Sequence, residues 1–314
     1  VAKAADIPPL FMINKRGETR PMVDLQGKFY VIDELAPEFV QKCMNVPLYS
    51  HHAGEYVKNA YDPKFNPGGK YDEKAASSAE DLNVVLCLEL KKDGKAFRTE
   101  KHVHNYPHCW RTDKPILYYP LDSWFIRTPK ARERLIKLNG TIKWKPASTG
   151  SGRFGKWLEN VQDWNLSRSR YWGTPLPIWR TEDGREETII GSYQELSDRI
   201  DEAVEKGFMK ENPLKAKGFR PGVFTKENYE LFDIHRPYVD EIILVSPSGE
   251  PMRRETDLID VWFDSGAMPY AQIHYPFENK ELLDSKEVYP ADFIAEGVDQ
   301  TRGWFFTLHA IAGM

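Results

Sequence analysis

The sequence predicts an α/β fold, and three stretches carry this prediction. Residues 293–295 are apolar and predict the end of a buried strand, and a helical pattern follows the break at 296–297. Residues 84–90 and 95–99 predict two strands, because an Asp-Gly turn joins two β-prone runs. Residues 193–208 place apolar side chains at helical spacing behind a capping box. Strands and helices therefore alternate along the chain.

Length and composition limit the class of protein. A chain of 314 residues with 41% hydrophobic residues suggests about two domains with a sizeable core. The formal net charge of −4 argues against a nucleic-acid footprint over the whole chain, but a local basic patch remains open. The candidates for that patch are Arg153, Lys156, Arg168, Arg170 and Arg180.

Cysteine usage and the chain ends bear on the cellular context. Cys43, Cys87 and Cys109 are widely spaced, which predicts a reducing compartment rather than a disulfide framework. No apolar run approaches membrane-spanning length, and the first residues lack a signal-peptide layout. The chain has no initial methionine and stops inside an apolar helical pattern, so we expect a fragment of a larger protein.

The first part of the chain is expected to be β-rich. A short helical tail precedes Pro8 and Pro9, and a strand is predicted over 11–13. A short helix is predicted over 34–40, and the hairpin over 84–99 follows. A cluster of possible metal ligands follows, consisting of His102, His104, His108 and Cys109. Three histidines and one thiol in this short stretch do not match a standard zinc spacing, so we predict no metal there.

The middle of the chain begins with two predicted helices. Thr128 and Pro129 should cap a helix that Gly140 ends, and residues 154–161 form an amphipathic helix. Between them, the Gly/Ser-rich run 150–155 lacks the Gly-Lys-Ser/Thr ending of a phosphate loop, so a linker is the favoured interpretation.

A strand is then expected over 164–167, with its turn at 168–172. Arg168 and Arg170 in this turn either face nucleic acid or a ligand phosphate, or they form surface salt bridges, and the functional and structural interpretations are about equally supported.

The last part combines a helix, a hairpin and a further strand. Ser192 and Glu195 form the capping box of the helix that Gly207 ends, and a strand over 241–245 runs into a plain hairpin turn at 246–249. Residues 257–263 are expected to return as an apolar strand that 264–266 end. Trp262 in this run is either a core residue or lines a ligand pocket.

The segment after residue 295 carries the candidate site. If a helix starts at the break, Glu296, Gln300 and Trp304 share one face beyond a strand end, where open α/β sheets bind ligands. Gly297 would let a ligand approach the backbone. From spacing alone, a plain helix N-terminus is favoured, with Glu296 and Asp299 set against the helix dipole and Trp304 in the core.

Three strings of residues resemble one family. They are 299–305 (Asp-Gln-Thr-Arg-Gly-Trp-Phe), 164–179 (Trp-Asn-Leu-Ser-Arg-Ser-Arg-Tyr-Trp-Gly-Thr-Pro-Leu-Pro-Ile-Trp) and 260–266 (Asp-Val-Trp-Phe-Asp-Ser-Gly). In this order they resemble the isoleucyl-tRNA synthetases of class I, and the resemblance covers most of the chain. The valyl and leucyl relatives share the Arg-Tyr-Trp-Gly and Trp-Phe-Asp-Ser elements, so a valyl-tRNA synthetase is the alternative within the family. These relatives do not carry the Asp-Gln-x-Arg-Gly-Trp-Phe string, which favours the isoleucyl enzymes.

The resemblance implies a fold, a reaction and partners. The fold is a Rossmann-type catalytic core with β-rich inserted modules. The intact enzyme would activate isoleucine with ATP and Mg²⁺, transfer it to tRNA(Ile) and edit mischarged valine. One methylene gives too little discrimination for a single site, and isoleucyl-tRNA synthetases are the standard example of this. A monomeric, cytoplasmic enzyme without membrane attachment is implied.

The resemblance also divides the chain and assigns a site. Residues 1–128 would end an inserted editing domain, 129–180 return to the catalytic core, 181–255 form a second insertion, and 256–314 complete the core. The aminoacyl-adenylate would lie against Glu296, Gly297, Asp299, Gln300, Trp304 and Trp262.

Three features that the family uses have no counterpart in this chain. The His-x-Gly-His and Lys-Met-Ser-Lys type motifs for ATP phosphates are not found, so the fragment alone is expected to be inactive. The upstream editing motif is not found either. Where relatives carry a Cys-Pro-x-Cys-Gly knuckle, this chain has serines at 246 and 248, and hydroxyls are poor zinc ligands, so no zinc is expected.

Two other classes of function remain open. A free-standing hydrolase that edits mischarged tRNA would show deacylase activity. A non-catalytic tRNA-binding module would show tight, salt-dependent binding of tRNA.

Overall fold

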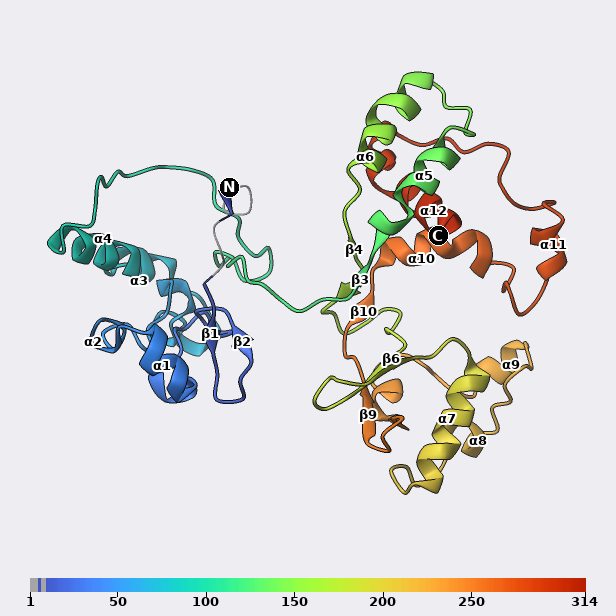
Figure 1. Ribbon diagram of the computed structural model, residues 1–314, viewed down its shortest axis with the longest axis horizontal. Helices are drawn as coiled ribbons and strands as arrows, with labels where there is room; N and C mark the ends of the chain where they lie inside the picture. Colours follow the sequence, from blue (N-terminus) through green and yellow to red (C-terminus); the bar gives the residue numbers. More distant parts are fainter. Residues whose placement is uncertain (1–4, 7–9) are drawn as a thin grey trace. The chain divides into compact units, whose positions relative to one another are not determined.

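The computed structural model describes residues 5–6 and 10–314, and the chain divides into two compact units, Val1–Leu121 and Asp122–Met314 (Figure 1). Each unit is described by itself. The helical tail expected before Pro8 lies outside the described residues, apart from residues 5 and 6. Helix and strand are mixed along the chain, as expected for an α/β protein.

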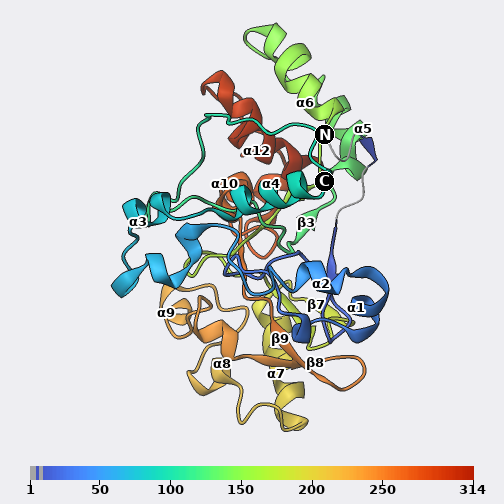
Figure 2. The ribbon, with the colours of Figure 1, turned by 90° about the vertical axis from the view of Figure 1, so that its left-hand side faces the viewer.

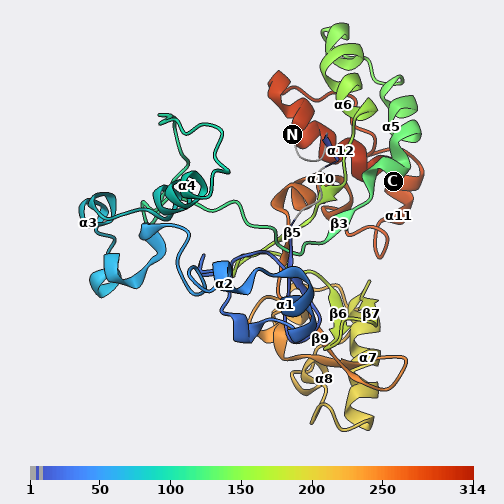
Figure 3. The same cartoon turned by 60° about the vertical axis from the view of Figure 1, so that its left-hand side comes forward.

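The first unit consists mainly of short helices. Strands β1 (Met12–Ile13) and β2 (Thr19–Arg20) pair antiparallel, which confirms the strand expected over 11–13. The helix expected over 34–40 lies three residues further on, as α1 (Pro37–Cys43). The remaining elements are η2 (Ile32–Glu34), α2 (Val46–Tyr49), η3 (Asn59–Tyr61), η4 (Pro63–Phe65), η5 (Pro67–Gly69), α3 (Glu73–Ser78) and α4 (Leu82–Lys92). Figure 3 shows α3 and α4 in this unit.

The predicted strand pair over 84–99 is wrong, because residues 84–90 lie inside helix α4. The Asp81 carboxylate accepts from the backbone N–H of Asn83 and caps the helix start. At the other end, the N–H groups of Gly94 and Lys95 donate to the carbonyls of Lys91 and Leu90. Gly94 has a φ of +67°, so the Asp-Gly pair ends a helix instead of turning a hairpin. The described part of this unit is therefore not β-rich.

A cluster of helices forms one core of the second unit. It contains η6 (Thr128–Ala131), α5 (Arg132–Asn139), the π-helix η7 (Thr149–Phe154), α6 (Gly155–Glu159), α10 (Val261–Ala271) and α12 (Trp304–Gly313). The helix expected from Thr128 to Gly140 is confirmed, whereas the expected linker over 150–155 is helical. Leu135, Phe154, Leu158 and Phe306 are buried at the centre.

An antiparallel sheet of four strands, in the order β7-β6-β9-β8, forms the second core of this unit. Its strands are β6 (Ile178–Thr181), β7 (Glu187–Ile189), β8 (Ile243–Val245) and β9 (Pro251–Arg254). Helix α7 (Tyr193–Glu205) packs against β8, and Figure 2 shows it beside β8 and β9. Short helices α8 (Pro213–Ala216), α9 (Lys226–Tyr229) and η8 (Tyr238–Glu241) complete this part.

Local signals in the sheet region are confirmed. The Ser192 hydroxyl accepts from the N–H of Glu195, while the Glu195 carboxylate accepts from the N–H of Gly191. The expected turn at 246–249 joins β8 to β9, and its N–H groups at Ser246 and Gly249 bond across the turn.

Short strand pairs connect the helical cluster to the sheet. Strand β3 (Phe125–Ile126) pairs with β4 (Trp164–Asn165), and β5 (Ser167–Arg168) pairs with β10 (Leu258–Ile259), each antiparallel. The strand expected over 164–167 is therefore present but interrupted. All strand pairs in the described ranges are antiparallel.

Two strand predictions near the candidate site are wrong in part or in full. The strand expected over 257–263 is present only as β10 (Leu258–Ile259), and helix α10 includes Trp262 and continues to Ala271. Residues 293–295 form no strand, and Phe293 and Ile294 are exposed. The helix expected from Glu296 begins later, as η9 (Val298–Arg302) followed by α12, and α11 (Lys280–Asp284) precedes this segment. No helix among the described residues is long and apolar enough to cross a bilayer.

Candidate functional site

The start of helix α10 is built on one buried carboxylate, Asp260, which is 3% exposed. Its Oδ1 accepts from the backbone N–H of Trp262 at 3.3 Å. Its Oδ2 accepts from Nε1 of Trp164 at 3.1 Å and lies 3.0 Å from Nη2 of Arg168. A buried carboxylate with three donors is compensated, because each oxygen meets an N–H group. Asp260 therefore ties strands β4 and β5 to the turn that carries Trp262.

Helix α12 packs against the first turns of α10 and brings three predicted site residues together. Nε1 of Trp304 donates to the carbonyl of Ser265 at 3.0 Å, and Oε1 of Gln300 accepts from the backbone N–H of Trp304 at 2.9 Å. A Cβ on Gly303 would lie 2.7 Å from Oε1 of Gln300 and 3.3 Å from the Trp262 ring. Trp262, Gln300 and Trp304 therefore meet around Gly303, where an added side chain would displace the Gln300 amide.

The residues before η9 are less enclosed. Glu296 is exposed and precedes the helical turn, so it does not share a regular helix face with Gln300 and Trp304. Gly297 is the N-cap of η9, and a Cβ there would lie 2.5 Å from Oδ1 of Asp299. Nε2 of Gln300 donates to Oδ2 of Asp299 at 3.2 Å. The segment before α12 thus carries one exposed carboxylate, Glu296, and a second carboxylate, Asp299, that accepts from the Gln300 amide.

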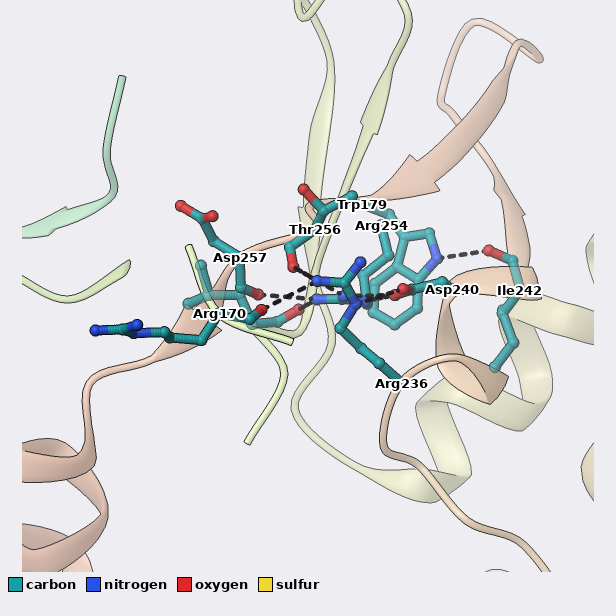
Figure 4. Close-up of polar contacts among 9 residues, drawn as sticks. Arg170, Trp179, Arg236, Asp240, Ile242, Arg254, Thr256 and Asp257 are labelled. Atoms are coloured by element: carbon teal, nitrogen blue, oxygen red, sulfur yellow. Dashed lines mark hydrogen bonds and ion pairs between the residues drawn. The ribbon is translucent and has the colours of Figure 1, made fainter. Parts of the chain in front are cut away.

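Arg168 and Arg170 differ in their surroundings. Arg168 donates through Nη1 to the backbone carbonyls of Asn165 and Ser167 and pairs with Asp260 through Nη2, so it supports the start of α10. Arg170 is exposed, and its backbone carbonyl accepts from Nη1 of Arg236 at 3.1 Å. Figure 4 shows the Arg170 side chain extending away from the polar cluster that holds its backbone.

That cluster joins the sheet to the loop that contains Arg170. The side chain of Arg254 is 0% exposed, and its Nε donates to Oδ1 of Asp240 at 2.7 Å. Nε of Arg236 donates to Oδ2 of the same carboxylate at 2.8 Å. Burial lowers the pKa of Arg254 from its usual value, and the hydrogen bond and charge of Asp240 oppose this shift. Asp240 therefore compensates two guanidinium groups (Figure 4).

The other basic candidates lie on separate elements. Arg180 on β6 pairs with Glu255 at 3.2 Å and with Glu187 at 3.7 Å. Arg153, in the π-helix η7, donates through Nε to Oγ1 of Thr301 at 3.0 Å. Arg153 and Lys156 are themselves exposed, so these two candidates lie at the surface of the helical cluster, apart from Arg168 and Arg170.

Sequence reasoning missed Asp260 and Asp264. An Asp directly before an apolar run is an N-cap signal, but the apolar run over 257–263 also fits a strand. Asp264 accepts from Oγ1 of Thr174 at 3.3 Å. Burial and the charge of Asp260 raise the pKa of Asp264, and the Thr174 hydrogen bond opposes them. Both carboxylates lie in the first turns of α10, next to Trp262.

A cavity of about 530 Å³ lies elsewhere in the second unit, and sequence reasoning did not predict it. Its walls are mainly apolar and come from the sheet, α7 and the segment after α10. Leu176, Trp179, Tyr193, Phe219 and Phe277 are among the lining residues. None of the predicted site residues lines this cavity.

The chemistry that the α10–α12 corner offers is recognition of a small amphipathic ligand. Two indole rings provide an apolar wall, the Gln300 amide can donate and accept, and the carboxylates at 296 and 299 can accept from hydroxyl or ammonium groups. Within the described ranges there is no group of three or more His, Cys, Asp or Glu side chains that could hold a metal ion.

Comparison with known proteins agrees with the resemblance of the three motifs to class I tRNA synthetases. The family model described as tRNA synthetases class I (I, L, M and V) matches residues 60–313. Isoleucine–tRNA ligase of Bacteroides thetaiotaomicron is 70% identical over 314 residues, which is 100% of this chain and 27% of that protein. Isoleucine–tRNA ligase of Porphyromonas gingivalis is 64% identical over the same coverage.

A more distant relative points the same way. Isoleucine–tRNA ligase of Thermus thermophilus is 45% identical over 234 residues, 74% of this chain and 20% of that protein. The chain thus spans about a quarter of the length of the curated relatives that it matches in full. Since the family model matches well over half of it, the chain belongs to the class I tRNA synthetases of the isoleucine, leucine, methionine and valine group.

Proposed function

We propose that the full-length product of the gene encoding this chain is an isoleucine–tRNA ligase. It activates isoleucine with ATP and Mg²⁺ to the aminoacyl-adenylate and transfers the acyl group to tRNA(Ile). The observation that carries this proposal is the 64–70% identity, across the entire chain, to relatives named isoleucine–tRNA ligase. The motif at 299–305 supports isoleucine over valine as the amino acid.

In this proposal, the corner between α10 and α12 is one wall of the adenylate site. Trp262 and Trp304 offer indole faces to a branched apolar side chain. Gln300 bridges polar atoms of the ligand at no cost in charge, and Gly297 and Asp299 lie beside it. Glu296 accepts from ribose hydroxyls or from the ammonium group, because a carboxylate repels the phosphate. The exposure of Glu296 supports this role, since the carboxylate is accessible to a ligand.

The remaining assignments belong to the same proposal. The catalytic core is Rossmann-type, residues 1–128 end the editing domain that removes mischarged valine, and residues 181–255 form a second insertion. The sheet and α7 share a core that lies mostly within 181–255 and begins at Trp179 on β6, which supports the assignment of an inserted module. A monomeric enzyme of the cytoplasm follows from the resemblance.

Isoleucine-dependent exchange of pyrophosphate into ATP tests the proposal in the full-length protein. Isoleucine should support exchange far better than valine or leucine. Glu296→Ala should lower adenylate formation by the contribution of a charged hydrogen bond, roughly 1.5–3 kcal/mol or about ten- to a hundredfold. Glu287→Ala is the matched control, because it removes an equally exposed carboxylate of the preceding segment.

Two results would contradict the proposal. The first is equal exchange with valine and isoleucine, which would favour a valyl enzyme. The second is normal adenylate formation by Glu296→Ala, or an isoleucyl-adenylate analogue bound far from Glu296 and Gln300, which would remove the site assignment.

A further inference from the structure

Residues 170–172 carry two neighbouring aromatic rings that face solvent. Tyr171 is 62% exposed and Trp172 is 67% exposed. Each ring is supported on one side by a residue of another segment. The rings of Trp172 and His235 are stacked, with centroids 4.8 Å apart and an interplanar angle of 16°. Cζ of Arg236 lies 5.3 Å from the centroid of the Tyr171 ring.

The supporting residues are themselves fixed. Nη1 of Arg236 donates to the carbonyls of Arg170 and Thr256 at 3.1 and 2.9 Å. Its Nε donates to Asp240, the carboxylate that also binds the buried Arg254 (Figure 4). Asp233 accepts from the backbone N–H of His235 and contacts Nδ1 of its ring at 2.8 Å. Since these contacts hold the loop backbone and one face of each ring, binding on the other face costs little ordering entropy.

The same loop also carries a cation, Arg170, which directly precedes the two aromatic residues in the sequence. The side chain of Arg170 is exposed and points away from the Asp240 cluster (Figure 4). Two adjacent exposed aromatic rings, each backed by a residue of another segment and accompanied by an arginine, suit the binding of unpaired nucleotides, because bases stack on the rings and the cation attracts phosphate. A purely apolar protein partner would provide no anionic group for Arg170.

We propose that Tyr171 and Trp172 form a platform on which unpaired nucleotides of an RNA stack, with Arg170 on the phosphate. His235 and Arg236 are positioning residues of this platform. The inference deepens the proposed function, on which it rests for the choice of RNA as the partner. It assigns the RNA contact to aromatic residues in addition to the arginine.

Fluorescence anisotropy of the 314-residue chain with a labelled single-stranded oligoribonucleotide of 12 nucleotides tests the platform. The single strand should bind more tightly than the same sequence in a duplex. Trp172→Ala should weaken binding about five- to a hundredfold, the effect of losing one stacked base, whereas Trp172→Phe should keep most of the affinity. Arg170→Gln should lower the slope of log affinity against log salt by about one.

The role of His235 has its own readout. His235→Ala should weaken binding, and His235→Phe should restore it, because a flat ring again supports Trp172. Trp110→Ala is the matched control and should bind normally. Trp110 is also exposed and lies under a neighbouring arginine, Arg111, at 4.7 Å, but belongs to the other unit.

Several results would overturn the inference. They are no binding by the unchanged chain, preference for the duplex, or equal affinity of the Trp172→Ala and Trp110→Ala variants. If Trp172→Ala does not fold, Tyr171→Leu and Arg170→Gln decide the matter, and unchanged affinity in both rejects the platform. Pyrophosphate exchange needs no RNA, so failure of the proposed ligase activity and failure of this binding are separate results.

Discussion

Replacing Asp260 by Asn should destabilise the second unit far more than an ordinary exchange of Asp for Asn. The Asp260 carboxylate is buried and accepts from Trp164, Arg168 and the backbone of Trp262. Asparagine keeps one acceptor oxygen, but its NH₂ group would replace Oδ2 and face the N–H groups of Trp164 and Arg168. One buried N–H group then loses its partner, and the guanidinium of Arg168 loses its counter-charge.

The magnitude follows from these two losses. An unsatisfied buried donor costs about 1–3 kcal/mol. The ion pair adds only about 1 kcal/mol, because the Arg168 side chain is 41% exposed and water screens its charge. The free energy of unfolding should therefore fall by about 2–4 kcal/mol.

Urea unfolding followed by tryptophan fluorescence measures this change. Of the nine tryptophans, only Trp110 lies outside Asp122–Met314, so the signal reports mainly on the second unit. The midpoint should shift while the slope stays constant, as for a change in stability alone. Asp264→Asn is the matched control. Asp264 lies one helical turn further on and has a raised pKa, so loss of its charge should change stability by less than about 0.5 kcal/mol.

Equal stability of the Asp260→Asn and Asp264→Asn variants would refute the reasoning. It would mean that Asp260 is not a buried acceptor shared by Trp164, Arg168 and the start of α10. A coupling energy near zero between Asp260→Asn and Arg168→Met in a double-mutant cycle would refute the ion-pair contribution separately.

Two further predictions concern packing and pH. Gly266→Ala should lower stability by about 1–3 kcal/mol through overpacking, because the new Cβ would lie 2.9 Å from atoms of Thr307 and Ile311 on α12. Gly152→Ala, which meets nothing within 4 Å, should be neutral in the same thermal unfolding assay, and equal losses would contradict the packing account. The ring nitrogens of His52 lie 2.9 Å from the carboxylates of Glu55 and Glu89. The hydrogen bond with Glu55 raises the pKa of His52 above its usual value, Glu89 raises it further, and burial opposes this shift. The contribution of His52 to stability is therefore complete below about pH 6.5 and is lost as the pH rises through the raised pKa. His52→Gln should be destabilising at pH 6 and nearly neutral at pH 9. A constant difference in stability across this pH range would contradict the prediction.

The sequence alone determined the features that depend on neighbouring residues. The Ser192 cap and Gly207 fixed the limits of α7, because a cap and a left-handed glycine act within one helical turn. The turn at 246–249 was predictable for the same reason. The family, too, followed from three strings of residues, and the comparisons confirmed that resemblance.

The tertiary structure decided what the short apolar runs become. Residues 84–90 and 261–266 have enough apolar and β-branched side chains for a strand, yet both are helical and follow the N-caps Asp81 and Asp260. Periodicity cannot separate a short buried strand from a short helix, since the difference lies in which backbone donors find a partner.

The candidate site shows the same division. The sequence predicted Trp262, Gln300 and Trp304 as site residues on two stretches about 40 residues apart, and it predicted one helix face for Glu296, Gln300 and Trp304. Only the packing of α10 on α12, with a glycine at the contact, brings Trp262 to the other two and leaves Glu296 outside the helix. Long-range contacts of this kind depend on shape and on a shared buried acceptor, Asp260, and neither is a property of a local stretch of sequence.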